Sequence, residues 1–247
     1  MSNRHSLTTR RPALGRAAPK YKILSENVRE YKRDLVLSAA VEVFYERGYQ
    51  NATVDEVAAA LSMSKSLVYN NFGAKSELLE GIVDRVQGEM LIYATNLDMG
   101  LPPPERLANL CYYHTAFTLK HQKAIAIVFR ERRNFSAEFS QTFKKRQDKV
   151  IGTFIKTLDE GVACGDFRAM DTELVAFQIL GMIGMIFDWQ WHRDRERLSQ
   201  GALSRDFAEQ ALRLAGYAGE FTFHTRDLAL GSGGVITDPP GGAASGR

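Results

Sequence analysis

The chain has 247 residues, of which 45% are hydrophobic and two are cysteine, and its formal net charge is +3. This length and hydrophobic content support a sizeable core and predict two domains of unequal size. Two isolated cysteines are too few for a disulfide framework or a zinc site, and no apolar run approaches the roughly 20 residues that span a bilayer. We therefore expect no metal site, no membrane partner and a cytoplasmic location.

The N-terminal segment is strongly basic. Residues 1–29 carry seven lysines and arginines and one acid, a charge of +6, whereas residues 30–86 carry six bases and nine acids. A disordered arm of this composition is able to lie in the minor groove of DNA and attract phosphates that the acidic segment does not attract. A solvated tail without a partner explains the composition equally well. The segment lacks the apolar stretch of a secretory signal.

Residues 53–75, TVDEVAAALSMSKSLVYNNFGAK, predict two short helices separated by a tight turn. Thr53 and Glu56 have the spacing of a capping box, so the first helix is expected to begin directly after Thr53. The run Ser62-Met63-Ser64 then interrupts the helix, because serines compete for backbone hydrogen bonds. Ser64 is the expected cap of the second helix.

The second helix has one apolar side and one polar side. Val68 and Phe72 stand four residues apart and are expected to face the core. The other side chains between Lys65 and Asn71 offer hydrogen-bonding groups on a short helix. Such a helix fits the major groove, where asparagine pairs with adenine and lysine with guanine. From these two helices alone, an ordinary helical hairpin with a solvated polar face is an equal alternative.

A wider window, residues 33–85, resembles the DNA-binding domain of the tetracycline-repressor (TetR) family of bacterial regulators. The resemblance rests on an AA-x-x-x-F helix that ends in Glu46-Arg47-Gly48-Tyr49, the Thr53 cap, the Val57-Ala58 pair, Tyr69-x-x-Phe72 and Lys75-x-x-Leu78-Leu79. It implies an all-α fold in which a three-helix helix-turn-helix DNA-binding domain precedes a larger helical ligand-binding and dimerisation domain. The positions that depart from the family pattern are Ser62, where glycine is common, Leu67, Asn71 and Ala74.

By the same resemblance, Tyr69 and Lys75 hold phosphates, while Lys65, Ser66, Leu67 and Asn70 face base edges. Phosphate contacts fix the register of a protein on DNA, whereas base contacts discriminate between sequences. The predicted DNA-binding residues are Thr53, Lys65, Ser66, Leu67, Tyr69, Asn70, Asn71 and Lys75.

Beyond residue 77 the chain changes to longer helical patterns, and no segment alternates like a strand. We expect helices at 76–93, 105–120, 122–133, 136–163, 171–192 and 204–219. The expected domains are a disordered basic arm (1–29), the DNA-binding domain (30–77), the ligand-binding and dimerisation domain (78–228) and a flexible tail (229–247).

Residues 174–191, LVAFQILGMIGMIFDWQW, are apolar almost all round the expected helix. Gly181 and Gly184 would let another helix approach closely, and burial of every side requires more partners than one domain readily supplies. Together with 204–219, this helix is expected to form a four-helix homodimer interface. A two-fold dimer reads a palindromic operator in double-stranded DNA.

The effector site is sought in residues 120–149, which carry nine lysines and arginines against three acids. Phenylalanines alternate with these cations, an arrangement that suits an amphiphilic anion. On this chemistry alone, a solvated helix face over core aromatics is the simpler alternative.

A second resemblance, to the C-terminal domain of TetR-type regulators of fatty-acid and steroid catabolism, favours a ligand. It rests on FRERRNFSAEF (129–139), on Gly165-Asp166-Phe167 and on ILGMIGMIFDWQWHR (179–193). Members of that group commonly sense acyl-CoA thioesters. The candidate ligand-binding residues are Phe129, Arg130, Arg132, Arg133, Phe139, Phe143 and Trp189.

The leading interpretation is a ligand-responsive transcriptional repressor. The alternatives are a DNA-binding protein without a small-molecule effector and an all-helical enzyme. No nucleophile motif or phosphate-binding loop occurs in the sequence, so we expect no catalytic residue and no cofactor. His114 and His121 lack a thiol or carboxylate at ligand spacing, and we interpret them as packing or surface residues.

Overall fold

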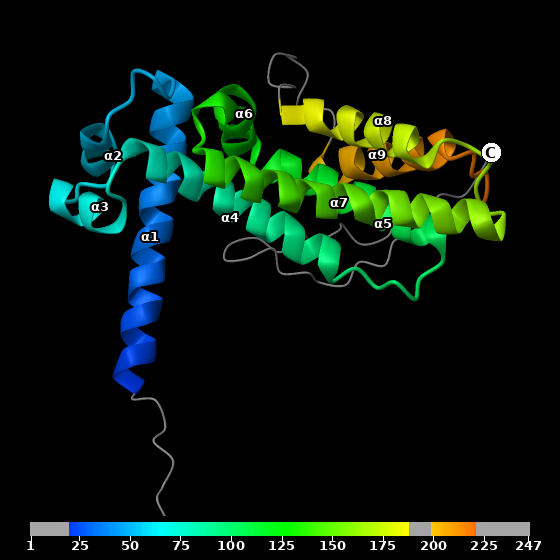
Figure 1. The fold of residues 1–247 in the computed structure, drawn as a ribbon, viewed down its shortest axis with the longest axis horizontal. Helices are drawn as coiled ribbons and strands as arrows, with labels where there is room; N and C mark the ends of the chain where they lie inside the picture. Colours follow the sequence, from blue (N-terminus) through cyan, green and yellow to red (C-terminus); the bar gives the residue numbers. More distant parts are fainter. Residues whose placement is uncertain (1–19, 188–198, 221–247) are drawn as a thin grey trace, which may run out of the picture.

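The computed structural model describes residues 20–187 and 199–220, and within these ranges every regular element is a helix (Figure 1). The predicted all-α fold is confirmed. The N-terminal elements are α1 (Lys20–Arg47), α2 (Val54–Ala60), α3 (Lys65–Asn71) and α4 (Lys75–Thr95). They are followed by α5 (Pro103–Lys120), α6 (Gln122–Glu131), the short 3-10 helix η1 (Arg132–Asn134), α7 (Ala137–Cys164), α8 (Thr172–Gly184) and α9 (Gln200–Leu214).

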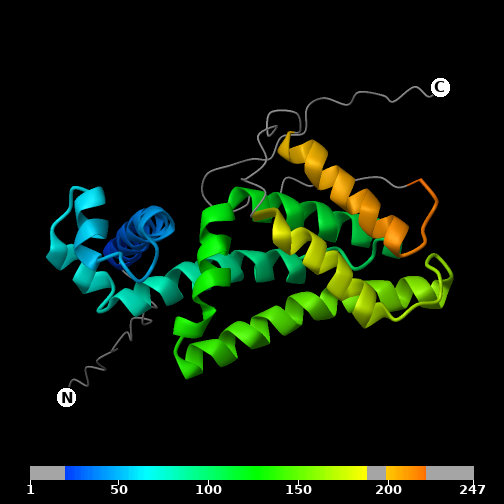
Figure 2. The same ribbon diagram turned by 90° about the horizontal axis from the view of Figure 1, so that it is seen from above.

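The helices form two units, which we call the head (residues 20–86) and the body (residues 87–187 and 199–220). Figure 1 shows the head at one end of an elongated molecule, with α6 standing between α1 and the rest of the body. Seen from above in Figure 2, α4 leads out of the head into the body, where α5, α7, α8 and α9 pack together. None of the helices in the described ranges is long and apolar enough to cross a bilayer.

Two hydrophobic clusters stabilise these units. The head cluster draws on α1 to α4, and its most buried members include Phe44, Val57, Val68, Phe72 and Leu79. Three buried body residues complete the head cluster: Phe117, Ala124 and Ile127. The body cluster includes Tyr112, Phe154, Leu158, Ile179 and Ile183. Head and body therefore share a core. Full burial of one such side chain contributes about 1.5–3 kcal/mol, so moving α6 away from α1 would cost free energy.

The first helix starts earlier than the sequence analysis expected. Residues 20–29, assigned there to a disordered arm, form the first turns of α1, and this part of the expectation is wrong. The last helix breaker before α1 is Pro19, and residues 20–47 contain neither glycine nor proline. No residue between Lys20 and Arg47 therefore breaks the helix through its backbone chemistry. Residues 1–19 lie outside the described ranges.

Side-chain caps set the starts of three body helices. Ser136, Asp171 and Ser199 each accept the backbone N–H three positions further on, at 3.2, 3.0 and 3.1 Å. The expected start at residue 204 is therefore wrong, because the Ser199 cap begins α9 at Gln200. The helix expected over 171–192 ends at Gly184 as α8, and residues 188–192 lie outside the described ranges, as does the tail 229–247.

The expected domain boundary after residue 77 does not coincide with a gap in the packing. Leu78, Leu79 and Ile82 of α4 are completely buried in the head cluster. The first turns of α4 therefore belong to the head by their contacts. The same helix continues without a break into the body.

Candidate nucleic-acid interface

Helix α2 begins where the capping-box pattern predicted. The Thr53 backbone N–H donates to Glu56 Oε2 at 2.8 Å, and the Glu56 backbone N–H donates to Thr53 Oγ1 at 3.2 Å. The Thr53 hydrogen bonds hold the pKa of the Glu56 carboxyl below its usual value. Thr53 is exposed at the surface of the head, but its hydroxyl is already used by the cap, and its contact with DNA stays a prediction.

The turn between α2 and α3 is a Schellman motif. Met63 N–H donates to Ala58 O at 3.1 Å and Ser62 N–H donates to Ala59 O at 3.0 Å, which satisfies two carbonyls at the end of α2. Ser62 adopts φ 52°, the left-handed conformation that glycine adopts without strain. This geometry explains why glycine suits the position, and it shows that the helix-turn-helix tolerates a serine there.

The inner side of α3 anchors the helix to the head. Val68 and Phe72 are buried, as predicted, and the Arg33 guanidinium of α1 lies over the Phe72 ring at 4.2 Å. Leu67 and Asn71 are half-buried, and Asn71 Nδ2 donates to Leu67 O at 2.7 Å. This hydrogen bond uses one of the two Nδ2 hydrogens and orients the amide, whose second hydrogen and Oδ1 are still able to contact a base. The DNA roles of Leu67 and Asn71 stay predictions.

The outer side of α3 carries four exposed side chains. Lys65 forms an ion pair with Asp55 of α2, and the hydrogen bond to Asp55 raises the pKa of the Lys65 ammonium. Ser66 Oγ lies 3.0 Å from Ser64 Oγ. Tyr69 and Asn70 make no side-chain hydrogen bond within the described part of the chain, and Tyr69 is 48% exposed. Tyr69 and Asn70 are therefore the predicted contacts that are most available to a partner.

Lys75, predicted to hold a phosphate, points back into the head. Its ammonium donates to the carbonyl oxygens of Tyr49, Gln50 and Ala52 at 2.9, 3.1 and 3.1 Å, and it lies over the Tyr49 ring at 4.6 Å. A lysine ammonium has three donors, and all three are occupied. Lys75 thus ties α4 to the loop before α2. A phosphate contact stays a prediction that requires at least one of these bonds to open.

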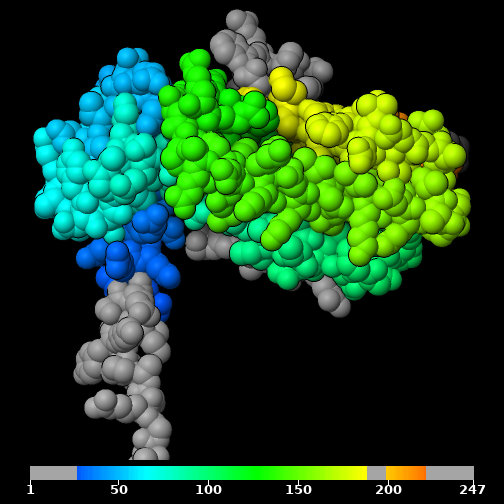
Figure 3. Space-filling model, viewed as in Figure 1, coloured from blue at the N-terminus to red at the C-terminus, as the bar shows by residue number. Residues whose placement is uncertain are grey.

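Polar contacts reinforce the joint between the head and the body, which abut closely in the space-filling view (Figure 3). Lys123 of α6 forms an ion pair with Glu42 of α1. Arg146 of α7 lies 2.5 Å from Asp84 of α4. The Ser136 backbone N–H before α7 donates to a head residue, Glu80, at 2.9 Å. These contacts link α6 and the start of α7 to α1 and α4 of the head.

The candidate ligand-binding residues separate into two groups. Phe139 and Phe143 pack on Phe135 at ring-centroid distances of 5.3 and 5.5 Å. Phe129 instead stacks on Phe187 at 4.8 Å, with Arg132 over its ring at 6.0 Å. Each group is packed on its own aromatic neighbour, and a ligand site formed by these residues stays a prediction. Of the other candidates, Arg130 lies over Tyr45 of the head, Arg133 is exposed, and Trp189 falls outside the described residues.

The interior of the body holds polar atoms that the sequence analysis did not single out. Gln87 Oε1, His114 Nδ1 and Thr115 Oγ1 are buried and have no hydrogen-bond partner among the described residues. His114 packs edge-to-face on Phe154 at 5.9 Å, and burial lowers its pKa to about 4. This packing agrees with the interpretation of His114 as a packing or surface residue. His114 and Thr115 lie among apolar residues of α5, and this pattern was the sequence signal that could have identified them.

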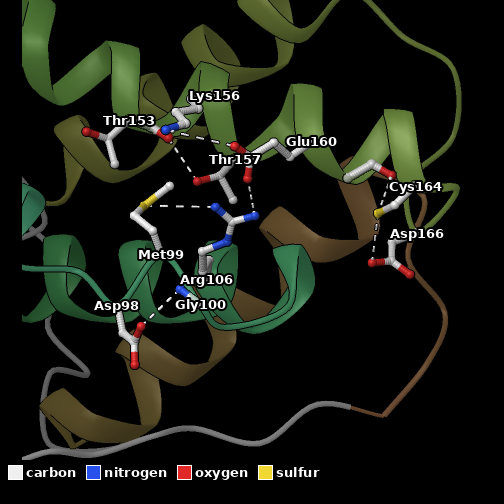
Figure 4. Close-up of polar contacts among 11 residues, drawn as sticks. Asp98, Met99, Gly100, Arg106, Thr153, Lys156, Thr157, Glu160, Cys164 and Asp166 are labelled. Atoms are coloured by element: carbon white, nitrogen blue, oxygen red, sulfur yellow. Dashed lines mark hydrogen bonds and ion pairs between the residues drawn. The ribbon is translucent and has the colours of Figure 1, made fainter.

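The far end of the body contains a buried arginine (Figure 4). Arg106 of α5 forms an ion pair with Glu160 of α7, and its Nη1 lies 3.9 Å from Met99 Sδ. Next to it along α7, Cys164 Sγ lies 3.2 Å from Asp166 Oδ2. The Arg106–Glu160 pair ties α5 to α7, whereas the Cys164–Asp166 contact is local to the end of α7. Within the described ranges no three histidine, cysteine, aspartate or glutamate side chains cluster as a metal site.

Helix α8 presents an apolar outer side. Leu174, Phe177 and Met185 are 55%, 64% and 62% exposed, and Gly181 lies between them on the same side with open space beside it. The second glycine is different, because a Cβ on Gly184 would meet Phe129 of α6 at 3.8 Å. Gly181 is thus open on its outer side, whereas Gly184 faces a helix of the same chain.

Sequence comparison identifies two matching family descriptions. Residues 36–82 match "Bacterial regulatory proteins, tetR family", and residues 100–215 match "Tetracyclin repressor-like, C-terminal domain". The HTH-type transcriptional regulator YhgD of Bacillus subtilis (strain 168) is 30% identical over 162 residues, which cover 64% of this chain and 84% of YhgD.

Two solved structures share the fold. A regulatory protein of the tetR family from Rhodococcus RHA1 has a TM-score of 0.69 and 24% identity, covering 76% of this chain and 98% of that one. The structure of AibR in complex with isovaleryl coenzyme A and operator DNA has a TM-score of 0.64 and 21% identity, covering 76% of this chain and all of AibR.

Proposed function

Since this chain belongs to the TetR family of bacterial transcriptional regulators, we propose that it is a repressor that binds a palindromic operator as a homodimer and is released by a small effector. The observation that carries the proposal is helix α3, a short helix with a buried anchor and an exposed row of hydrogen-bonding side chains. The matching family description and the name of YhgD are those of regulators, which supports the proposal. The proposed target is the bacterial chromosome, which agrees with a cytoplasmic location.

In the proposed complex, the outer side of α3 enters the major groove. Asn70 reads a base edge, with Ser66 and Lys65 beside it, and Tyr69 holds a phosphate. Lys65 exchanges its ion pair with Asp55 for a DNA contact. This exchange requires little energy, because both partners are exposed and solvent screens their attraction.

The proposed dimer uses the apolar outer side of α8. A row of exposed Leu174, Phe177 and Met185 leaves apolar area in water, and contact with the same row of a second copy removes it. Two heads related by a two-fold axis then face half-sites about one helical turn apart, roughly 34–36 Å.

An acyl-CoA thioester is the proposed effector. The anionic end of such a ligand suits the exposed arginines near the η1 turn, and the buried atoms His114 Nδ1 and Thr115 Oγ1 are available to a polar group of the ligand. AibR, which shares the fold, has been solved with isovaleryl coenzyme A and operator DNA. To release DNA, the effector must bind more tightly to the conformation that is incompetent for DNA, and the shared core of α1 and α6 carries the change to the head.

One observation favours a second candidate, a regulator that binds DNA without a small effector. The predicted ligand residues lie in two groups, Phe135, Phe139 and Phe143 on one side and Phe129 with Phe187 on the other. If these groups serve only to pack the joint between head and body, no ligand is needed to explain them.

A gel-shift experiment tests both proposals. The purified chain should shift a palindromic fragment from the promoter region of its own or a neighbouring gene at low salt, and one acyl-CoA from a panel of chain lengths should reverse the shift. Failure to shift any fragment from that locus would count against the repressor. Retained binding with every thioester would remove the effector proposal and favour the second candidate.

A further inference from the structure

The N-terminal part of α1 extends beyond the region that matches the family. The family match begins at residue 36, whereas α1 begins at Lys20, so somewhat more than four helical turns, or roughly 24 Å, precede it. Figure 1 shows this part of α1 projecting past α2 and α3. Side chains 27–34 are all exposed. Residues 27–34 therefore leave most of their side-chain surface open to a partner.

Two arginines fix the direction of this extension relative to α3. Arg33 lies over the Phe72 ring at 4.2 Å and donates to Asn71 O, at the end of α3, at 3.4 Å. From α4, Arg85 Nη1 donates to Asp34 O at 3.3 Å and to Ser38 Oγ at 3.1 Å. The base of the extension is therefore anchored to the C-terminal end of α3 and to α4.

The extension and α3 enclose a groove of about 310 Å³. Arg29 and Lys32 stand three residues apart on α1, on the side that continues through Arg33 to the buried Val36. The lining residues are Val28, Arg29 and Lys32 from α1 and Leu67, Asn70 and Asn71 from α3. One wall is cationic and the other carries amides, so the groove suits an anion next to a hydrogen-bonding surface.

We propose that this groove holds a DNA strand, with Arg29 and Lys32 on backbone phosphates while Asn70 on the opposite wall reads a base. The inference rests on the proposed function and adds a second DNA-binding element. Two facts favour DNA over a protein partner: the cationic wall is complementary to phosphate, and the groove is continuous with the predicted base-reading side of α3. Residues 30–86 carry more acids than bases, so this segment as a whole does not attract DNA. Cations in the groove therefore supply a local attraction to phosphate.

The test is the salt dependence of DNA binding by the full chain and by an Arg29→Ala/Lys32→Ala variant. Each phosphate contact adds about −0.9 to the slope of log K against log salt concentration. The slope of the variant should be shallower by about 0.9 for each phosphate contact that is lost. The variant should also bind operator DNA and random DNA more weakly, with the same fold-loss of affinity for both. Both side chains are exposed, so the melting temperature should be unchanged.

A Lys156→Ala/Arg213→Ala variant is the matched control, because it removes two exposed positive charges from the body without touching the groove. Its slope should equal that of the wild type. An unchanged slope in the Arg29→Ala/Lys32→Ala variant would overturn the proposed phosphate contacts and leave the repressor proposal standing. Weaker binding to the operator alone would also contradict them, since phosphate contacts are blind to sequence. If the wild type binds no DNA, the proposed function itself fails.

Discussion

Helices α3 and α8 are built in the same way but present opposite chemistry to solvent. Each buries one side, α3 through Val68 and Phe72 and α8 through residues such as Ile179. The outer side of α3 carries hydroxyl and amide groups, whereas that of α8 carries exposed leucine, phenylalanine and methionine. The buried sides explain the fold, and the outer sides indicate the partner: hydrogen-bonding groups suit base edges, and an apolar row suits a second protein surface.

The buried side of α3 can be broken by Phe72→Ala. This change leaves a cavity in the head cluster and removes the ring on which Arg33 lies, so we expect a loss of about 3–5 kcal/mol in the free energy of unfolding. Urea unfolding followed by circular dichroism measures it. Tyr69→Phe, on the outer side of the same helix, is the control and should unfold like the wild type. A loss below about 1 kcal/mol for Phe72→Ala would mean that α3 is not anchored as described.

The interior of the body differs from the head in containing a buried neutral histidine. The pKa of His114 is about 4 in the folded chain, below its usual value of 6.5. Between these values the unfolded chain binds the proton and the folded chain does not, so stability falls as the pH is lowered from 6.5 to 4, by up to about 3 kcal/mol. In His114→Gln this contribution should disappear. Parallel curves of stability against pH for the two proteins would contradict a buried neutral His114.

The outer side of α8 can be tested by Phe177→Glu. A charge in the centre of the apolar row should weaken the proposed dimer by about 2 kcal/mol or more, a factor of about 30 in the dissociation constant. Sedimentation equilibrium measures the change, and binding to a palindrome should weaken with it. Gln147→Glu adds the same charge at an exposed position of α7, away from the apolar row of α8, and should remain dimeric. Equal behaviour of the two variants would place the dimer interface elsewhere.

The smallest expected effect concerns the turn that sets the angle of α3. Ser62 has φ 52°, so Ser62→Gly should relieve strain and stabilise the chain by about 0.5–1 kcal/mol. Ala59→Gly, in the right-handed backbone of α2, should have the opposite sign and cost about 1 kcal/mol. Thermal unfolding of both variants checks the pair. Destabilisation by both changes would rule out the left-handed conformation at Ser62.

The head was predictable where its structure depends on near neighbours in the sequence. Thr53 and Glu56 are three residues apart, and Val68 and Phe72 are four apart, so local spacing alone was sufficient to place the cap and the buried side of α3. The start of α1 was missed because a basic composition was taken as disorder, although no residue after Pro19 breaks the helix.

Contacts between distant segments were not predictable from pattern. Lys75 has the position of a phosphate-binding residue, yet its donors reach carbonyls more than twenty residues away in the chain. Likewise, Phe129 and Phe139 occur close together in the sequence on either side of the η1 turn. In the structure Phe129 packs on Phe187, whereas Phe139 packs on Phe135. The fate of such side chains depends on how helices pack, and single-sequence spacing does not contain that information.

The central claim, that the outer side of α3 reads an operator, is tested most directly by selecting binding sites from random DNA with the wild type and with Asn70→Ala. The wild type should enrich a palindrome whose half-sites lie about 10 base pairs apart. The variant should fold and dimerise normally and should lose discrimination at one symmetry-related pair of positions, by about 1–3 kcal/mol. Enrichment of the same palindrome with unchanged preferences by Asn70→Ala, or of no symmetric site by the wild type, would contradict the claim.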